Sequence, residues 1–375
     1  MRFVVDARYA GPRPSGIGEC VRALGKRLPA VAPEANLHFW VRPGTARFAE
    51  GPRVSYEQIR TAPASLTTLL APRLLGRLET DDVFHAPANI LGFGLPCPAI
   101  VTVHDLMWLE HVDWCQPVPW LRPISGRYYG VGIRRALEQS ARVLTVSHAS
   151  ADAILRLFPR AKAKLVVTRN ACEPMFCAPD SLAEAETAAA RATGVNGPYF
   201  LVVGQNQPSK AHHVALRAFA AVAERVEQRL VLVQRLEPGR GLHRLAQDLG
   251  VAERVSFVPG LRLDQLLPVY QAASALVQPS LAEGFGLPAL EAIACGCPVI
   301  ASDIPPLREV LGPAGTFAPP GNFDDLAHAL LLLANDVQRR SELRARGLEQ
   351  AKTFSWDETT KLTWDVYRDV AARGR

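Results

Sequence analysis

The sequence predicts an α/β protein built from two successive domains, each a parallel sheet with helices on both faces. Three observations favour this class. The chain has 375 residues, which is long for a single hydrophobic core. Short, continuously apolar runs alternate with helical stretches along the whole chain, as strands buried on both faces require. The alternation also restarts near residue 199, after a stretch rich in Ala and Glu.

The first domain is expected to span 1–172, with a linker at 173–198. Its opening strand, 3–5, is followed by a helix at 20–32 and then by a second strand. The other apolar runs of this half predict the strands 38–41, 82–85, 99–103, 142–146 and 165–167.

The second domain is expected to span 199–353. Its strands are expected at 199–204, 230–233, 255–258, 275–277 and 298–301, with helices at 211–227, 241–249, 264–271, 287–295, 323–335 and 338–350. The last segment, 354–375, contains the aromatic-bearing helix Trp356–Val370, which we expect to pack back on the first domain. Open sheets of this class bind ligands outside the carboxyl ends of their strands.

The composition excludes several classes of protein. Hydrophobic residues make up 48% and charged residues 21% of the chain, which is typical of a globular protein. The seven cysteines are odd in number and scattered, which favours a reducing compartment over a disulfide framework. No apolar run approaches the roughly 18 to 20 residues of a membrane span, and the amino terminus does not read as a signal peptide. We therefore expect a cytoplasmic protein.

The positive charge is concentrated in the first half. Residues 1–172 hold 22 Lys and Arg against 13 Asp and Glu, a net charge of +9, whereas the remainder has a net charge of −3. Such a half suits an anionic partner, either a phosphorylated acceptor or the inner membrane face, although an ordinary solvated face explains it equally well. Leu69–Leu78 and Trp120–Arg135 are candidate membrane contacts, but amphipathic helices packed on a sheet are slightly favoured. No nucleic-acid-binding motif is present.

The most informative segment is Pro279–Ala292, which follows the strand 275–277. Gly284 and Gly286 let the backbone approach a ligand, and Pro288 suits the first turn of a helix. The free N–H groups of such a helix start form an anion site that fits a diphosphate. Glu283 and Glu291 bracket this site, and carboxylates accept strong hydrogen bonds from sugar hydroxyls. Alone, either glutamate could simply be a carboxylate that stabilises the start of a helix through the helix dipole.

This segment resembles the Glu-x7-Glu motif of the retaining glycosyltransferases of family GT4. The resemblance implies the GT-B fold, in which two Rossmann-like domains face each other across a cleft. It spans nearly the whole chain and is closest to bacterial mannosyltransferase-like enzymes that build O-antigen, capsule or exopolysaccharide. The supporting segments, individually weak, are Ser15–Gly18, Thr102–Leu106, Thr145–Ser147, Asn170, Val202–Lys210 and Ala294–Asp303.

The resemblance implies a role for each matching residue. Glu291 would bind the ribose and Glu283 the donor sugar, while Lys210 would neutralise the departing diphosphate, which a fixed cation stabilises. His104, at a strand end, would contact the donor sugar and is not assigned as a general base; a purely structural histidine is the alternative. The remaining substrate-binding candidates are Gly16, Gly18, Asn170, Ser280, Phe285, Gly286 and Leu287.

One position departs from the family pattern. Many members carry an arginine after the glycine of the strand at 199–204, and this chain has Gln205 there. Arg235 is a candidate for the second cation, and both residues are candidate substrate contacts. Asp81-Asp82 and His212-His213 do not suit a metal, because the first pair begins a strand and adjacent helical residues point apart. We expect neither a metal nor a cofactor.

The leading hypothesis is transfer of a hexose, best read as mannose from GDP-mannose, to a glycan acceptor carried on a lipid. The alternative hypothesis is a phosphorylase or sugar-nucleotide epimerase of similar fold, which would have the same cleft but a different second substrate. A non-catalytic nucleotide-binding protein is a third reading, supported by Gln205. A dehydrogenase is disfavoured because Val21 stands where the dinucleotide fingerprint needs its third glycine.

Overall fold

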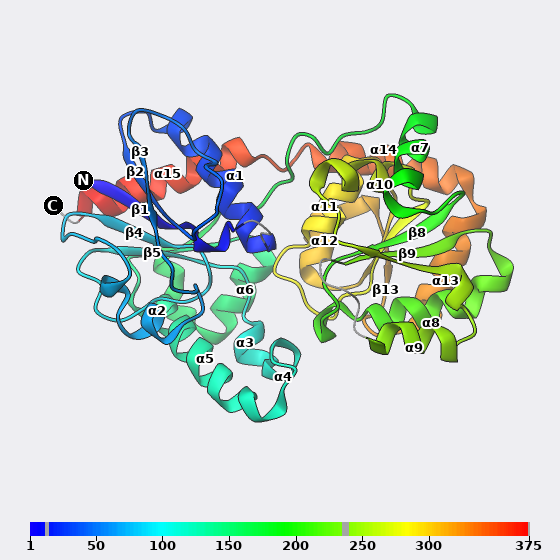
Figure 1. The fold of residues 1–375 in the computed structure, drawn as a ribbon, viewed down its shortest axis with the longest axis horizontal. Coiled ribbons are helices and arrows are strands. Elements are labelled where there is room, and N and C mark those ends of the chain that lie inside the picture. Colours follow the sequence, from blue (N-terminus) through cyan, green and yellow to red (C-terminus); the bar gives the residue numbers. More distant parts are fainter. Residues whose placement is uncertain (12–14, 235–239, 374–375) are drawn as a thin grey trace. The chain divides into compact units, whose positions relative to one another are not determined.

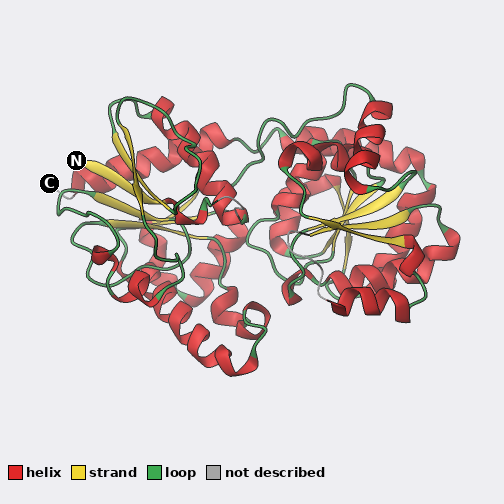
Figure 2. Ribbon diagram, in the orientation of Figure 1, coloured by secondary structure: helices red, strands yellow, loops and turns green. Residues whose placement is uncertain are grey.

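The computed structural model describes residues 1–11, 15–234 and 240–373, which form two compact units (Figure 1). The first unit comprises Met1–Ala171 and Ser355–Arg375, and the second comprises Cys172–Phe354. Each unit has its own parallel sheet, flanked by helices (Figure 2). The predicted α/β class is confirmed.

The sheet of the first unit has the order β3-β2-β1-β4-β5-β6-β7 within the described residues. Its strands are β1 (Arg2–Asp6), β2 (Asn36–Val41), β3 (Val54–Gln58), β4 (Val83–Ala86), β5 (Ala99–Val103), β6 (Arg142–Thr145) and β7 (Leu165–Val167). The edge strand β3 was not predicted. Its residues are half-buried or exposed and three of the five are polar, so no continuous apolar run marks it in the sequence.

The helices of the first unit are α1 (Gly16–Val31), α2 (Leu66–Leu70), α3 (Met107–Glu110), α4 (Val112–Cys115), α5 (Arg122–Gln139), α6 (His148–Leu157) and α15 (Trp356–Arg373). Helix α1 begins four residues before the predicted start, because the Ser15 hydroxyl accepts a hydrogen bond from the N–H of Gly18 and caps the helix.

The carboxy-terminal helix α15 packs inside the first unit. Phe3 of β1 stacks on Tyr367 with ring centroids 5.5 Å apart, and Trp364 meets Phe3 edge-on at 5.0 Å. The Tyr367 hydroxyl lies 2.7 Å from Nδ1 of the buried His85. Because aromatic pairs and a buried hydrogen bond both fix it, α15 is an integral layer of this unit.

The sheet of the second unit has the order β10-β9-β8-β11-β12-β13 within the described residues. Its strands are β8 (Tyr199–Val203), β9 (Arg229–Gln234), β10 (Val255–Pro259), β11 (Ala275–Gln278), β12 (Val299–Ser302) and β13 (Gly315–Ala318). The short edge strand β13 was not predicted, since its residues are mostly half-buried.

The helices of the second unit are α7 (Leu182–Thr193), α8 (His212–Val222), α9 (Arg240–Asp248), α10 (Leu263–Ala272), α11 (Leu287–Ala294), α12 (Pro305–Leu311), α13 (Phe323–Asn335) and α14 (Val337–Ala351). Helix α7 lies in the segment 173–198 that we expected to be a linker. Its buried Ala185 and Ala189 let it pack closely on α10, so this segment is part of the second unit.

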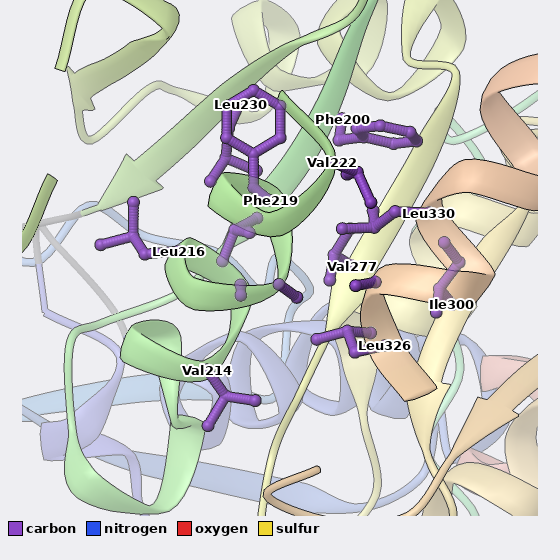
Figure 3. Packing of buried hydrophobic residues seen from close by; sticks show 14 of the residues in the cluster. Phe200, Val214, Leu216, Phe219, Val222, Leu230, Val277, Ile300, Leu326 and Leu330 are labelled. Carbon is purple, nitrogen blue, oxygen red and sulfur yellow. The ribbon is translucent and has the colours of Figure 1, made fainter. Parts of the chain in front are cut away.

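The core of the second unit shows why its strands read as continuous apolar runs. Alternate residues, such as Phe200 of β8, Leu230 of β9 and Val277 of β11, enter one cluster beneath α8 and α13 (Figure 3). The intervening residues are buried as well, because helices cover the other face.

Two further features bear on the setting of the protein. Within the described residues, no helix has the length and apolar character needed to span a bilayer. All seven cysteines are free thiols.

Candidate functional site

The polar residues of the second unit gather where neighbouring strands end. Strands β9, β8 and β11 lie side by side, and the outer two end in the buried Gln234 and Gln278. Gly204 follows β8 with φ +137°, a backbone conformation that L side chains rarely adopt. Parallel strands bring these ends to one edge of the sheet, which is where open α/β sheets bind ligands.

Lys210 and Glu283 form an ion pair at this edge. The Lys210 ammonium lies 2.6 Å from Oε2 of Glu283. The other carboxylate oxygen accepts hydrogen bonds from the Ser280 hydroxyl at 2.8 Å and from Nε2 of Gln278 at 2.9 Å. The Glu283 side chain is 7% exposed and that of Lys210 is 26% exposed. Three donors thus hold one carboxylate, while the ammonium reaches solvent.

The environment keeps Glu283 ionised. Burial raises the pKa of its carboxyl, but the charge of Lys210 and the hydrogen bonds from Lys210, Ser280 and Gln278 outweigh burial. The net result is a pKa below the ordinary glutamate value. Glu283 is therefore a fixed carboxylate at neutral pH.

The start of α11 presents unpaired backbone donors. Within the described residues, nothing accepts a hydrogen bond from the N–H groups of Phe285, Gly286 or Leu287. Gly286 caps the helix with φ +107°, and a Cβ there would lie 2.6 Å from Cδ2 of Leu307. The Phe285 ring is buried edge-on against Phe354, which anchors the loop. Successive free N–H groups at a helix start bind anions.

Glu291 lies one turn into α11, as the Glu-x7-Glu spacing predicts. Its Oε2 accepts a hydrogen bond of 2.8 Å from the hydroxyl of Tyr270, a buried residue of α10. The Tyr270 ring is in turn edge-on to Phe176, with centroids 5.9 Å apart. The second glutamate is therefore oriented by a tyrosine that sequence reasoning did not identify.

Gln205 stands where many family members carry an arginine. Gln205 is half-buried in the loop after β8, beside the strand end that carries Gly204. Arg235, the candidate second cation, lies outside the described residues. Lys210 is therefore the cation that the structure brings to Glu283.

His104, in the first unit, is held by its backbone surroundings. Its Nε2 lies 2.8 Å from the Pro87 carbonyl, so Nε2 carries the hydrogen and Nδ1 is left as an acceptor. Its own N–H donates to Oδ1 of Asn89 at 2.7 Å. Burial lowers the pKa of His104 to about 4, and the bond to Pro87 opposes this shift. His104 is therefore neutral at pH 7.

The remaining candidates of the first unit are Gly16, Gly18 and Asn170. Gly16 is exposed at the first residue of α1, whereas Gly18 is buried one turn behind the Ser15 cap. Asn170 is buried just after β7, and its N–H donates to the Val146 carbonyl. These residues, like His104, belong to a different unit from Lys210 and Glu283.

Two residue pairs that the sequence disfavours as metal ligands each have a protein partner. Asp82 accepts a bidentate ion pair from Arg2, and His212 is buried against Gln234. Across the described ranges, no three His, Cys, Asp or Glu side chains converge in a way that could hold a metal ion.

Sequence reasoning missed Gln278, Gln234 and Tyr270. The two glutamines had a usable signal, since each is a polar last residue that directly follows an apolar run in its strand. Tyr270 had none, because an aromatic residue in an amphipathic helix reads as ordinary core.

Comparison with known proteins identifies the family. The family described as Glycosyl transferases group 1 matches residues 185–351, the part of the chain that carries Lys210, Glu283 and Glu291. The O-antigen chain mannosyltransferase B of Escherichia coli is 33% identical over 298 residues, which span 77% of this chain and 74% of the relative. This chain belongs to the group 1 glycosyltransferases.

Other relatives agree with that placement. The MMP alpha-(1->4)-mannosyltransferase of Mycolicibacterium hassiacum is 30% identical over 83% of this chain and 76% of the relative. A D-inositol 3-phosphate glycosyltransferase of Saccharomonospora viridis is 32% identical over 74% of this chain and 66% of the relative. The predicted resemblance to the GT4 family and its bacterial mannosyltransferases is confirmed.

Solved structures confirm the fold of this group 1 glycosyltransferase. WaaG, a glycosyltransferase involved in lipopolysaccharide biosynthesis, has a TM-score of 0.76 at 16% identity, over 98% of this chain and 99% of that chain. HepE from Anabaena in complex with UDP and glucose has a TM-score of 0.73 at 19% identity, over 97% and 98%. The GT-B architecture of two Rossmann-like units is thus established, and the chain is a glycosyltransferase.

Proposed function

We propose that this enzyme is a retaining, metal-independent hexosyltransferase that transfers mannose from GDP-mannose to a glycan on a lipid carrier, in bacterial surface polysaccharide synthesis. The observation that carries the proposal is the juxtaposition of the Lys210–Glu283 pair with the free N–H groups that open α11. The named activities of the two mannosyltransferase relatives support mannose as the sugar.

Each group has a task in the proposed reaction. The bond between the sugar anomeric carbon and the diphosphate oxygen breaks, and negative charge develops on the diphosphate. The Lys210 ammonium and the N–H groups of Phe285, Gly286 and Leu287 stabilise that charge. Their preorganised positions serve the phosphate without a metal ion.

The new bond forms on the same face of the sugar. The acceptor oxygen attacks the anomeric carbon, and its proton passes to the departing phosphate oxygen, so atoms and charge balance. Glu283 holds Lys210 and accepts a hydrogen bond from a sugar hydroxyl, while Glu291, oriented by Tyr270, accepts hydrogen bonds from the ribose hydroxyls. Neutral His104 offers Nδ1 to the donor sugar. Gly16, Gly18 and Asn170 serve the acceptor and diphosphate side.

A peripheral contact with the inner membrane face is part of the proposal. Trp120 is 73% exposed just before α5, and Ile124 is 64% exposed in its first turn. The exposed Arg127, Val131 and Arg134 continue the same stripe at helical spacing. Apolar side chains interleaved with arginines suit an anionic lipid surface, and such a surface would carry the acceptor. The proposed location is therefore the cytoplasmic face of the membrane.

The D-inositol 3-phosphate glycosyltransferase relatives favour a second acceptor class. A phosphorylated polyol would also suit the basic first unit. This candidate differs from the first in the acceptor and leaves the site in the second unit unchanged.

The test is a donor and acceptor matrix on the purified chain. Thermal shifts with GDP-, UDP-, ADP- and dTDP-sugars rank the donors, because a ligand of the native state raises the melting temperature. Turnover is then measured with a polyprenyl-linked oligosaccharide and with inositol 3-phosphate, each with and without EDTA. We expect the GDP-mannose and lipid-linked pair to react, unaffected by EDTA, with retained anomeric configuration by NMR.

Four results would contradict the proposal. Inverted product excludes the retaining route, and loss of turnover in EDTA excludes metal independence. Epimerisation of the donor without any acceptor would favour an epimerase, and binding without chemistry would favour a non-catalytic role.

A further inference from the structure

Lys210 is presented by an unusual turn. It ends a short 3-10 turn, Pro208–Lys210, and His212 begins α8. The residue between them, Ala211, is fully buried with φ +47°. Among described residues other than glycine, Asn89 is the other one with positive φ. A side chain in this conformation is strained and persists only when its surroundings hold it there.

His212 holds one end of this turn. Its ring is 2% exposed, and Nδ1 lies 2.8 Å from Nε2 of Gln234, which is 1% exposed at the end of β9. Because the amide donates, the imidazole accepts at Nδ1 and must be neutral. Burial, together with the neighbouring charge of Lys210, lowers the pKa of His212 to about 4. The acceptor is thus available at neutral pH.

A backbone bond holds the other side. The N–H of Leu281 donates to the Ser209 carbonyl at 2.7 Å, which ties the turn to the loop that carries Glu283. The Lys210 turn is therefore fixed between the end of β9 and the Glu283 loop. This arrangement sets where the ammonium lies, and the long lysine side chain alone would not.

We propose that His212 is a positioning residue, which acts through the buried hydrogen bond to Gln234 to hold the Ala211 turn and so place the Lys210 ammonium at the diphosphate. It does not touch substrate. The inference rests on the proposed function insofar as Lys210 contacts the diphosphate of the donor. Nothing in the family match assigns a task to His212.

A double-mutant cycle tests this role. Wild type, His212→Leu, Lys210→Ala and the double variant are compared for GDP affinity by calorimetry, and for kcat and KM with GDP-mannose. We expect His212→Leu to weaken GDP binding about fivefold and to lower kcat at least about tenfold in the wild-type background. In the Lys210→Ala background the same change should alter either quantity less than about twofold, because the ammonium it places is gone.

Matched variants separate positioning from general damage. His212→Asn keeps an acceptor where Nδ1 lies and should recover most of the affinity, whereas His212→Gln, with its amide one bond further out, should not. His213→Leu alters the exposed neighbour and should leave both quantities unchanged. If His212→Leu fails to fold, the Asn and Gln pair decides the question.

The outcomes distinguish the two proposals. The positioning role would be overturned if His212→Leu reduced GDP affinity and kcat by the same factor in both backgrounds. It would also be overturned if His212→Gln were as active as His212→Asn. Either result leaves the transferase proposal standing. If the effect of His212→Leu on GDP affinity depends on Lys210 but wild type transfers no hexose, the positioning role is supported and the proposed reaction fails. Wild type that binds neither GDP nor UDP would overturn both.

Discussion

The Lys210 ammonium and the Glu283 carboxylate lie 2.6 Å apart, although 73 residues separate them in the chain. The contact joins the loop after β8 to the loop after β11, two neighbouring strands of one sheet. Glu283 is also held by Ser280 and Gln278, so the pair has one arrangement. A cation fixed in this way needs no reorganisation when charge develops beside it.

Removing the cation should cost both activity and stability. Lys210→Ala is expected to lower kcat by about 10² to 10³, because one fixed charge at the diphosphate is lost. It should also lower the free energy of unfolding by about 1 to 3 kcal/mol, since Glu283 is left buried without its partner. Single-turnover kinetics and urea denaturation measure the two effects. Adding Glu283→Gln should restore stability without activity; recovery of activity would contradict the assignment.

Tyr270 should affect binding more than chemistry. Tyr270→Phe removes the hydroxyl that donates to Glu291 and keeps the buried ring in α10. We expect KM for the donor to rise about threefold to tenfold with kcat within about twofold, as for a lost hydrogen bond that serves ground and transition states alike. Glu291→Gln should raise KM further. A fall in kcat at unchanged KM would place Glu291 at the reacting atoms instead.

Gly286 is expected to resist substitution. In Gly286→Ala the new Cβ would lie 2.6 Å from the Leu307 side chain, in a backbone with φ +107°. The free energy of unfolding should therefore fall by about 2 to 4 kcal/mol. The matched control is Gly194→Ala, also at positive φ (+73°) but with no heavy atom within 4 Å. It should cost only the backbone strain, about 1 kcal/mol. Equal losses in thermal or urea unfolding would contradict a steric role for Leu307.

The buried His212 should make stability depend on pH. Its pKa of about 4 lies below the ordinary histidine value of 6.5, so between these values the unfolded chain binds more protons than the folded chain. The contribution of neutral His212 to the free energy of unfolding is complete above pH 6.5. It decreases as the pH falls, by about 1.4 kcal/mol per pH unit down to about pH 4.

Urea unfolding of wild type and His212→Asn from pH 7 to 4.5 measures this slope. In the Asn variant the free energy of unfolding should change less steeply with pH, by about that slope, because asparagine does not titrate. His328→Asn changes an exposed histidine of the same unit and serves as the control. Parallel curves for wild type and His212→Asn would rule out the buried neutral imidazole.

The exposed stripe on α5 should govern membrane binding. Trp120→Ser with Ile124→Ser is expected to lower co-sedimentation with vesicles containing phosphatidylglycerol at least about fivefold, since two exposed apolar side chains are removed. Turnover of a water-soluble acceptor should not change. The control pair, Leu332→Ser with Val337→Ser, also removes two exposed apolar residues, which lie in the second unit. Equal loss in both pairs would point to nonspecific adsorption.

Local signals were enough to predict most of the fold. Central strands such as 199–203 and 99–103 are buried on both faces, so their apolar runs are visible in the chain. The edge strands β3 and β13 were missed because only part of their surface is covered. Helix α7 was taken for a linker because its packing face consists of alanines, which carry a weak hydrophobic signal.

The candidate site divides in the same way. The Glu-x7-Glu spacing with Gly286 and Pro288 is contiguous, so helix geometry alone predicts an anion site at the start of α11. Which donors hold Glu283, and that Tyr270 orients Glu291, depend on residues brought together from separate strands and helices. No spacing along the chain encodes those contacts.

The sequence by itself therefore determined the α/β class and the division into two sheets, and it indicated the glutamate pair, because periodicity and local motifs arise from neighbours in the chain. The resemblance to the GT4 family was what implied a role for Lys210. Only the tertiary structure decided that Lys210 and Glu283 form a buried pair, that Gln278 and Tyr270 orient the two glutamates, and that His212 is bound to Gln234. The contacts of Lys210, Gln278 and His212 come from the parallel order of β9, β8 and β11, which places distant strand ends at a single edge, whereas the Tyr270–Glu291 contact joins helices α10 and α11.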